Sequence, residues 1–528
     1  MKNLATKIIC ALLLLTMLVS CFAACGEPAP EQNGGTADNG GENNNTEGEN
    51  NTDEGNGLEG EEGEYLPADA NYGNYTFTMR APKQEVFGTG HYVAAEGKSD
   101  VINNALLERS LLLQDMFGFI LELDTSQNAG QLLTTMGNNH GAQKHWVDAL
   151  FIEANHSMTG AQRGNLWNLN LLEEMNLEAS YYDQRIQQNF RIGDKLFQLT
   201  GDYEVLDELV TFGVLYNDYL YDELGYYDDP NYGSPYKMVS DKKWTYNNMM
   251  TMAAPFTAEV AGAQYAEDNK WGIVSEEQAI YYFYMGAGLM PTASKNGQLE
   301  VLLNDSTAYA TTYQVLTNLI PFGQDPNVFF ISEVESVTGN DKAVIASDVF
   351  EQDRALFRTT SLSDAIYSAE MEHDFGILPV PLYAEGQAEY YNMINANAAW
   401  PLCIPLYVKD VHQTAEMIER LSYYSRYGGD ESLYEAFFER LTIAKICRKE
   451  EDREMLEMIF STKVYCIDTY LPVGSTGLYK LVISMANKGG DTLSSDLATK
   501  VEYAVKNIGK FTGNVDKFNA NQADKYAS

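Results

Sequence analysis

Polar side chains that can exchange hydrogen bonds with a ligand follow a short apolar run in the first third of the chain. The run is Val147-Asp-Ala-Leu-Phe-Ile152, and the residues after it are Glu153, Asn155 and His156. Such a run predicts a fully buried strand. Ligands of parallel α/β sheets bind beyond the carboxyl ends of strands, so these three residues are candidate ligand contacts. The alternative is an ordinary strand-to-helix turn in which the asparagine caps the helix.

This strand belongs to an alternating series of strands and helices. Strands are predicted at 75–79 and 119–123, and a helix over 100–114 begins at Asp100 as its N-cap. This alternation predicts a parallel α/β sheet. Further strands are predicted at 195–200, 212–216, 355–358 and 375–378, and further helices at 244–252, 276–286, 306–320, 411–427, 432–446, 450–460 and 492–506.

The first residues are typical of a bacterial export signal. Lys2 and Lys7 precede an apolar run over 8–19, which is shorter than the ~20 residues that span a bilayer. The sequences LVSC and FAAC, ending at Cys21 and Cys25, each resemble a lipobox, in which the cysteine becomes the lipid anchor. Cys21 has the better aliphatic residue upstream, whereas Cys25 directly precedes the change in composition. One of the two is therefore the expected anchor, and a secreted protein that loses both is the alternative.

A tether is predicted over 26–68, after a signal and lipobox over 1–25. Residues 26–64 contain twelve acidic and no basic residues and almost nothing apolar, so they cannot bury enough surface to fold. A flexible chain of this length reaches roughly 35 Å. The sequence therefore predicts a folded part that is held away from a membrane.

The charge of the chain excludes some partners. The net charge is −40, of which −30 falls on residues 65–528. The folded part therefore repels nucleic acid and anionic lipid, and the membrane is contacted through the lipid anchor alone. About 460 residues exceed one usual hydrophobic core, so two lobes are expected.

Motifs for metal, cofactor or covalent chemistry are missing from the sequence. Cys403, Cys447 and Cys466 are too few and too irregularly spaced for a zinc site or a disulfide framework, and buried free thiols are the preferred interpretation. There is no Gly-x-Ser-x-Gly, His-Glu-x-x-His, Walker or calcium-loop motif. No metal or cofactor is expected. Seventy-five acidic residues guarantee accidental carboxylate pairs, so a surface glycoside hydrolase stays an alternative.

Several segments occur in an order that resembles one known family. They are DALFI at 148–152, YYDQ at 181–184, IGDKLFQLTGDY at 192–203, VLYNDYL at 214–220, KWTYNNMMTMA at 243–253, EQDRALFRTT at 351–360, DFGILPVPLY at 374–383 and REMLEMIFSTKVY at 453–465. Their order resembles that of the extracellular solute-binding lipoproteins of bacterial carbohydrate ABC importers, of the family 1 type. Each segment alone is weak evidence, and the shared order over about 145–470 carries the resemblance.

The resemblance implies a fold. It is an α/β, two-lobe, periplasmic-binding-protein-like fold in which each lobe is a mostly parallel sheet flanked by helices and is discontinuous in sequence. The implied N-terminal lobe is 69–200 with about 340–376, and the implied C-terminal lobe is about 201–339 with 377–528. Crossings between the lobes are expected near 195–203, near 375–381 and in the late helices.

The resemblance also implies ligand contacts. Sugar hydroxyls donate and accept hydrogen bonds, and sugar C–H faces stack on aromatic rings. In addition to Glu153, Asn155 and His156, the resemblance implies ligand contacts for Asp202, Tyr203, Trp271, Arg358, Thr359 and Trp400. For Arg358 a structural salt bridge is the alternative. Trp244 is expected to pack in the core, and Asn217 to cap a helix.

The implied function is capture without catalysis. A monomer anchored on the extracellular face of the cell membrane would bind a carbohydrate, an oligosaccharide, between its lobes and deliver it to an ABC permease. The lobes would close by a hinge motion around the ligand. A binding lipoprotein for a peptide or another solute is an alternative that shares the fold.

Overall fold

The computed structural model describes residues 70–83, 92–95, 99–295, 297–339, 341–395, 398 and 400–527. The predicted signal, both candidate anchor cysteines and the predicted tether lie outside these residues. None of the described helices is long and apolar enough to cross a membrane. The described thiols Cys403, Cys447 and Cys466 are free, as expected.

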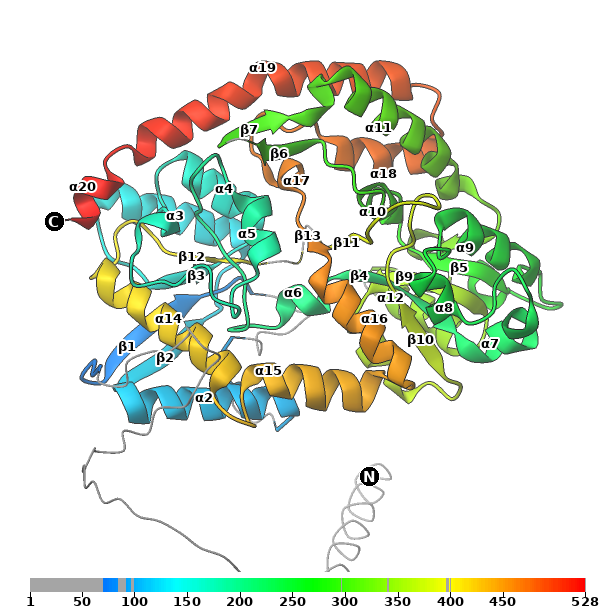
Figure 1. Cartoon of the computed structure of the whole chain (residues 1–528), viewed down its shortest axis with the longest axis horizontal. Helices are drawn as coiled ribbons and strands as arrows, with labels where there is room; N and C mark the ends of the chain where they lie inside the picture. Colours follow the sequence, from blue (N-terminus) through cyan, green and yellow to red (C-terminus); the bar gives the residue numbers. More distant parts are fainter. Residues whose placement is uncertain are drawn as a thin grey trace, which may run out of the picture. The chain divides into compact units, whose positions relative to one another are not determined.

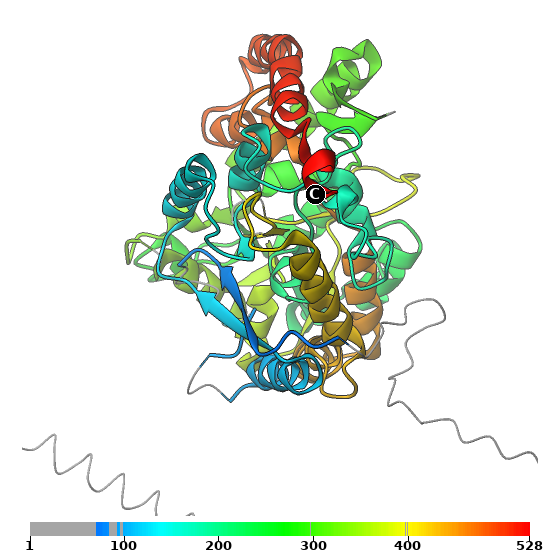
Figure 2. The same ribbon diagram turned by 90° about the vertical axis from the view of Figure 1, so that its left-hand side faces the viewer.

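The first sheet has the strand order β12-β3-β1-β2 and forms the centre of what we call the first lobe. The central strand β1 runs parallel to β2 and β3, as predicted, and β12 runs antiparallel to β3. Helix α2 contacts β2, and in Figure 2 it lies below the blue strands of this sheet. The strands are β1 (Tyr75–Arg80), β2 (Phe119–Asp124), β3 (Ala149–Phe151) and β12 (Leu402–Cys403), and the helices are α2 (Val101–Phe117), α3 (Ala129–Ala142), α4 (Ala154–Gln162), α5 (Gln184–Phe190) and α14 (Val411–Tyr427).

The second sheet has the strand order β10-β4-β9-β5-β8 and forms the centre of the second lobe (Figure 1). Strand β5 is parallel to β8 and β9, whereas β4 is antiparallel to β9 and β10. The strands are β4 (Phe212–Asn217), β5 (Trp271–Ser275), β8 (Val328–Phe330), β9 (Ala355–Ser361) and β10 (Phe375–Leu378), and the helices are α7 (Asp218–Glu223), α8 (Pro235–Ser240), α9 (Tyr246–Ala253), α10 (Ala279–Gly286), α11 (Ser306–Leu319), α12 (Asp341–Glu351) and α13 (Ser363–Tyr367).

The strand pairing differs from the predicted lobe boundaries. The segment from about 340 to 376 was expected in the N-terminal lobe, but β9 and β10 pair with β4 and β5 of the second sheet. Conversely, β12 and α14 pack in the first lobe, although they follow residue 377. Periodicity predicts that a strand exists, but the partner of that strand is chosen by tertiary packing.

Two extended segments cross between the sheets side by side. Leu199 pairs with Leu402 at the first sheet, and Thr211 pairs with Ile394 at the second. The first crossing therefore runs over about 199–211 and carries the short helix α6 (Leu206–Leu209), and the second joins Ile394 to Leu402. The predicted strand at 195–200 forms only isolated pairs. The crossing expected at 375–381 is wrong, because β10 lies within the second sheet.

The late part of the chain crosses once more and then covers both lobes. A π-helix over Ala436–Ile446 contacts both α2 and α13, and α16 packs on β10. The long helix α19, red in Figure 1, contacts both α4 and β7. The remaining elements are α15 (Leu433–Glu435), α16 (Glu450–Ser461), α17 (Ile467–Tyr470), α18 (Leu478–Lys488), α19 (Leu493–Asn519), α20 (Gln522–Tyr526), β6 (Thr292–Lys295), β7 (Gln298–Val301), β11 (Asn392–Met393) and β13 (Lys463–Val464).

Local signals that the sequence provides are realised in the structure. The side chains of Asp100, Thr245 and Asn217 cap α2, α9 and α7 by accepting backbone N–H groups. Such caps stabilise a helix by about 1 kcal/mol each. Trp244 is fully buried, and its Nε1 donates to the carbonyl of Pro379 at 2.8 Å, which confirms a packing role.

Candidate functional site

The carboxyl ends of the parallel strands in both sheets are directed toward the crossing segments. In the first sheet Leu402, where the second crossing enters β12, lies opposite Phe151 at the carboxyl end of β3. In the second sheet Phe212, where the first crossing enters β4, lies opposite Ser361 at the carboxyl end of β9. The two edges at which ligands of α/β sheets bind are therefore joined by the same crossings. We call them the facing edges.

The first facing edge carries two ionisable groups and a tryptophan. Glu153 precedes α4, and its Oε2 lies 3.0 Å from Nδ1 of His156 in the first turn. Asn155 is exposed and lies inside the helix, so it does not cap it. Trp400 is only 4% exposed and stands one residue before Pro401, whose carbonyl accepts from the N–H of Ile152. The structure therefore brings Trp400 to the strand end that Glu153 follows.

The second facing edge carries a buried charged group. Arg358 Nη2 lies 2.5 Å from Asp364 Oδ2, and Thr360 donates to the same oxygen. The hydroxyls of Thr359 and Ser275 lie 2.6 Å apart across β9 and β5. This edge thus combines a paired guanidinium with hydroxyl groups that can donate or accept.

One carboxyl group of the second edge has a shifted pKa. Burial and, to a lesser extent, the charge of Asp364 raise the pKa of Glu276, and Arg358 opposes them. The net result is a pKa of about 7. Glu276 directly follows β5. Near neutral pH this carboxyl group is therefore present in both its protonated and its ionised form.

Buried donors without partners lie at the facing edges. Among the described residues, no hydrogen-bond partner is found for Trp400 Nε1 or Arg358 Nη1, and both side chains are less than 5% exposed. Tyr282 stacks on Phe212, the first residue of β4, with ring centroids 3.5 Å apart, and its hydroxyl interacts with Tyr479. Buried polar groups are paired in most native structures. One unpaired buried donor at each facing edge therefore favours a polar ligand there.

Other predicted ligand contacts lie elsewhere. Trp271 begins β5 and therefore lies at the end of that strand opposite to Ser275, where it stacks on Phe329 and its Nε1 donates to the carbonyl of Ala266. Its burial contributes to the core of the second lobe. Tyr203 is 1% exposed and its hydroxyl donates to the carbonyl of Leu199 at 2.5 Å, so it fixes the first crossing.

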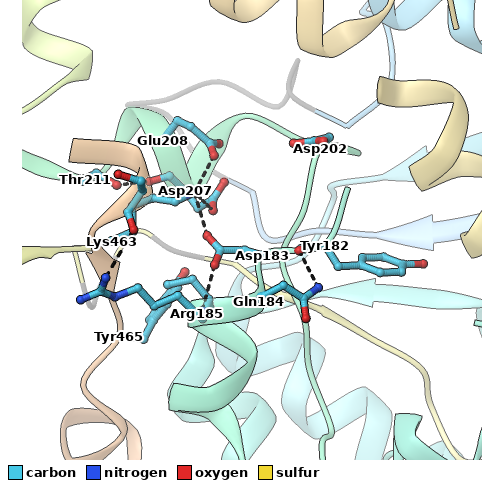
Figure 3. A network of polar contacts seen from close by, with 12 residues as sticks. Tyr182, Asp183, Gln184, Arg185, Asp202, Asp207, Glu208, Thr211, Lys463 and Tyr465 are labelled. Carbon is cyan, nitrogen blue, oxygen red and sulfur yellow. Dashed lines mark hydrogen bonds and ion pairs between the residues drawn. The ribbon is translucent and has the colours of Figure 1, made fainter. Parts of the chain in front are cut away.

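A buried ion cluster links the crossings. Lys463 in β13 is 5% exposed, and its Nζ lies 2.7 Å from Asp207 Oδ2 and 2.5 Å from Glu208 Oε1, both in α6. Asp183, which caps α5 in the first lobe, is 3.2 Å away. Figure 3 shows the three carboxylates gathered around the lysine. One ammonium thus connects β13 with the first crossing and the first lobe.

The cluster holds more acids than bases, and their pKa values separate. Burial and then the charge of Asp207 raise the pKa of Glu208 and of Glu204 well above the usual range. For Asp207 burial acts in the same direction, but Lys463 and neighbouring hydrogen bonds outweigh it and lower the pKa. The folded cluster therefore favours the ionised form of Asp207 beside Lys463 and disfavours the ionised forms of Glu204 and Glu208.

Asp202 lies in the first crossing but away from the two facing edges. It pairs with Arg426 of α14 at 2.7 Å, and burial raises its pKa to about 6 although Arg426 opposes the shift. It lines a cavity between α14 and α16, whose lining includes neither Glu153 nor Trp400.

The fold described above is shared with solved structures. The chain is 13% identical to a cyclo/maltodextrin-binding protein complexed with maltotetraose, at a TM-score of 0.53 over 82% of this chain and 96% of that one. It is 14% identical to the maltose-binding periplasmic protein MalE of Listeria monocytogenes in complex with maltose, at 0.52 over 82% and 97%. It is 13% identical to the ABC substrate-binding protein Lmo0181 of the same organism in complex with cycloalternan, at 0.50 over 85% and 99%.

The chain has the two-lobe fold of substrate-binding proteins. No protein-family model matches the sequence, and no curated protein matches it. The substrate-binding fold confirms the predicted α/β architecture with two discontinuous lobes.

Sequence reasoning missed several groups of this substrate-binding fold. Glu276 and Gln278 follow β5, and Tyr479 donates to Gln278 Oε1 at 2.9 Å from a segment 201 residues away. Lys463 is joined to acids that precede it by more than 250 residues. The position of Glu276 directly after an apolar strand, like that of Glu153, could have marked it as a candidate ligand contact. No local pattern in the sequence indicates the partners of Tyr479 and Lys463.

Proposed function

We propose that this protein captures a carbohydrate, an oligosaccharide, between its two lobes and delivers it to the permease of an ABC importer. The observation that carries the proposal is the shared fold. The three solved structures match over nearly their whole length, and all are binding proteins described with a carbohydrate bound. The facing edges of this chain supply independent support.

The groups at the facing edges suit a sugar. Trp400 offers an aromatic ring and an unpaired Nε1–H, while Arg358 offers a further buried donor, Nη1. Sugar hydroxyls accept such hydrogen bonds, and the C–H face of a pyranose packs on an aromatic ring. A buried donor without a partner destabilises the protein, and a ligand that accepts a hydrogen bond from it offsets this cost.

Closure follows from the crossings. Contacts from both facing edges stabilise the closed arrangement of the lobes only when a ligand lies between them. Hinge motions change the backbone angles of the few residues that join two lobes, so we place the hinge in the first crossing. The ligand therefore shifts the population toward the closed form by its differential affinity for that form.

The remaining parts of the proposal concern location and partners. Lipid on Cys21 or Cys25 holds the chain at the extracellular face of the membrane, and the acidic segment up to residue 68 is a tether. The protein acts as a monomer and breaks no bonds. Its partners are the carbohydrate and the permease subunits.

Titration calorimetry with maltose and maltotetraose tests the proposal, together with a thermal-shift screen of other oligosaccharides. A sugar at one hundred times its Kd stabilises the folded state by about 2.7 kcal/mol. Chromatography of the mixture should return the sugar intact. Release of smaller sugars would support a glycoside hydrolase instead. Stabilisation by peptides, with none by any sugar, would support the peptide-binding alternative.

A further inference from the structure

A cavity of about 580 Å³ lies between α14, α15, the π-helix, α16 and the first crossing. None of Glu153, Trp400, Arg358 and Glu276 lines it, so it is separate from the facing edges. Its volume falls within the 300–1,000 Å³ that is usual for small-ligand pockets.

One wall of the cavity is aromatic. The rings of Tyr434 and Phe438 lie 4.5 Å apart, and Phe460 of α16 meets Phe438 edge-on at 5.3 Å. All three side chains are only partly buried, although they line a cavity. They therefore present apolar surface to whatever fills it.

The other walls are polar and fixed by ion pairs. Asp202 is paired with Arg426, whose guanidinium also lies 4.3 Å from the ring centre of Tyr434. Arg453 Nη2 lies 2.6 Å from Glu439 Oε1, and its Nε lies 3.0 Å from Glu457 Oε1. Carboxylate acceptors and guanidinium donors thus alternate around the space.

The charges of the lining nearly cancel. Five acids and four bases line the cavity, and one of the acids, Glu208, has a pKa that burial and Asp207 raise well above its usual range. A charged ligand would therefore bring an unbalanced charge into a partly buried site, which is costly. A neutral ligand with many hydroxyl groups meets both the donors and the acceptors.

We propose that this cavity is a second binding site and that it takes a neutral polyhydroxylated ligand of the size of a mono- or disaccharide. Ring hydroxyls donate to the carboxylates of Asp202 and Glu439 and accept from Arg426 and Arg453. The C–H face of the ligand packs on the aromatic wall of Tyr434 with its two phenylalanine neighbours.

The test uses the folded protein with glucose and maltose as probes, in calorimetry and in crystal structures of the complexes. Tyr434→Ala removes part of the aromatic wall, and Ser461→Trp places a bulky side chain in the cavity from the end of α16. Ser495→Trp is the matched control, because Ser461 and Ser495 are both exposed and each donates to the carbonyl three residues earlier at 3.0 Å. Each cavity variant should weaken binding in the cavity at least tenfold, and the control should leave it unchanged.

The outcomes separate this proposal from the proposed function. Sugar density against Tyr434 that is lost in Ser461→Trp supports the second site, even when none lies at the facing edges. Sugar found only at the facing edges overturns the second site and leaves the proposed function standing. Binding at neither place overturns the second site, as does cavity binding that both variants leave unchanged.

Discussion

Replacing Lys463 by methionine tests whether the buried ion cluster stabilises the crossings. The variant keeps the apolar stem and removes the ammonium, which lies 2.7 Å from Asp207 Oδ2 and 2.5 Å from Glu208 Oε1. The side chains of Lys463 and Asp207 are 5% and 2% exposed, so water cannot replace the lost charge. Breaking a buried pair by removing one partner costs about 3–5 kcal/mol. This is a large part of the ~5–15 kcal/mol by which proteins are stable.

The loss of stability in Lys463→Met should depend on pH. The folded-state pKa of Asp207 is lowered, so its stabilising contribution is complete above its unfolded pKa of ~3.9 and disappears as the pH falls through the folded value. In Lys463→Met this carboxylate has no cation, so its pKa rises and protonation relieves it. The loss of stability should therefore be smaller at pH 5 than at pH 7.

Urea denaturation followed by tryptophan fluorescence measures the free energy of unfolding at both pH values. Lys237→Met is the control, because Lys237 is 71% exposed in its pair with Asp241 and should cost less than about 1 kcal/mol. Adding Asp207→Asn to Lys463→Met should recover part of the loss, since the most deeply buried carboxylate of the cluster is then no longer left without its cation. A loss for Lys463→Met as small as that for Lys237→Met would refute the reasoning.

Three further predictions concern the edges and the crossings. Trp400→Ala should weaken sugar binding about tenfold or more, and Trp271→Ala should leave the Kd unchanged in the same calorimetry; equal effects would contradict the placement of the site. Ionisation of Glu276 is disfavoured in the folded state, so the wild type should lose about 1–3 kcal/mol of stability as the pH rises from ~4.3, the unfolded pKa, to about 7. Glu276→Gln should not show this loss. If the free energy of unfolding in urea changes equally between pH 5 and pH 8 in both proteins, the prediction is wrong. Gly201→Ala would place a Cβ 2.2 Å from a backbone oxygen and should cost about 1–3 kcal/mol, whereas Gly509→Ala has nothing within 4 Å and should be neutral or slightly stabilising; the reverse order in urea denaturation would contradict the close approach.

Local patterns in the sequence predicted local structure well. The apolar run at 147–152 contains β3, and Asp100 and Thr245 cap the helices that they were expected to cap. These features depend on a few neighbouring residues, so a single sequence contains their cause. The strand predicted at 195–200 forms only isolated pairs, because its pairing depends on Leu402, which is about 200 residues away in the sequence.

The sequence predicted part of the candidate site. Glu153 and Trp400 lie at the first facing edge, and Arg358 lies near the second. Trp271 was expected at the cleft, but the register of β5 places it at the other end of the strand. The ion cluster of Lys463 was not predicted, because no periodicity reports which acids will meet a lysine more than 250 residues away.

The pairing of β12 with β3 has a consequence for the order of assembly during synthesis. Leu402 lies opposite Phe151, so the first sheet lacks an edge strand until about 250 further residues have been made. At ~5–20 residues per second the ribosome needs roughly 10 to 50 s for that length. All strands of the second sheet lie between Phe212 and Leu378, so that sheet is complete earlier. The sheet whose strands are translated first is thus the sheet that is completed last, and until then the edge of β3 is open to pairing with other chains.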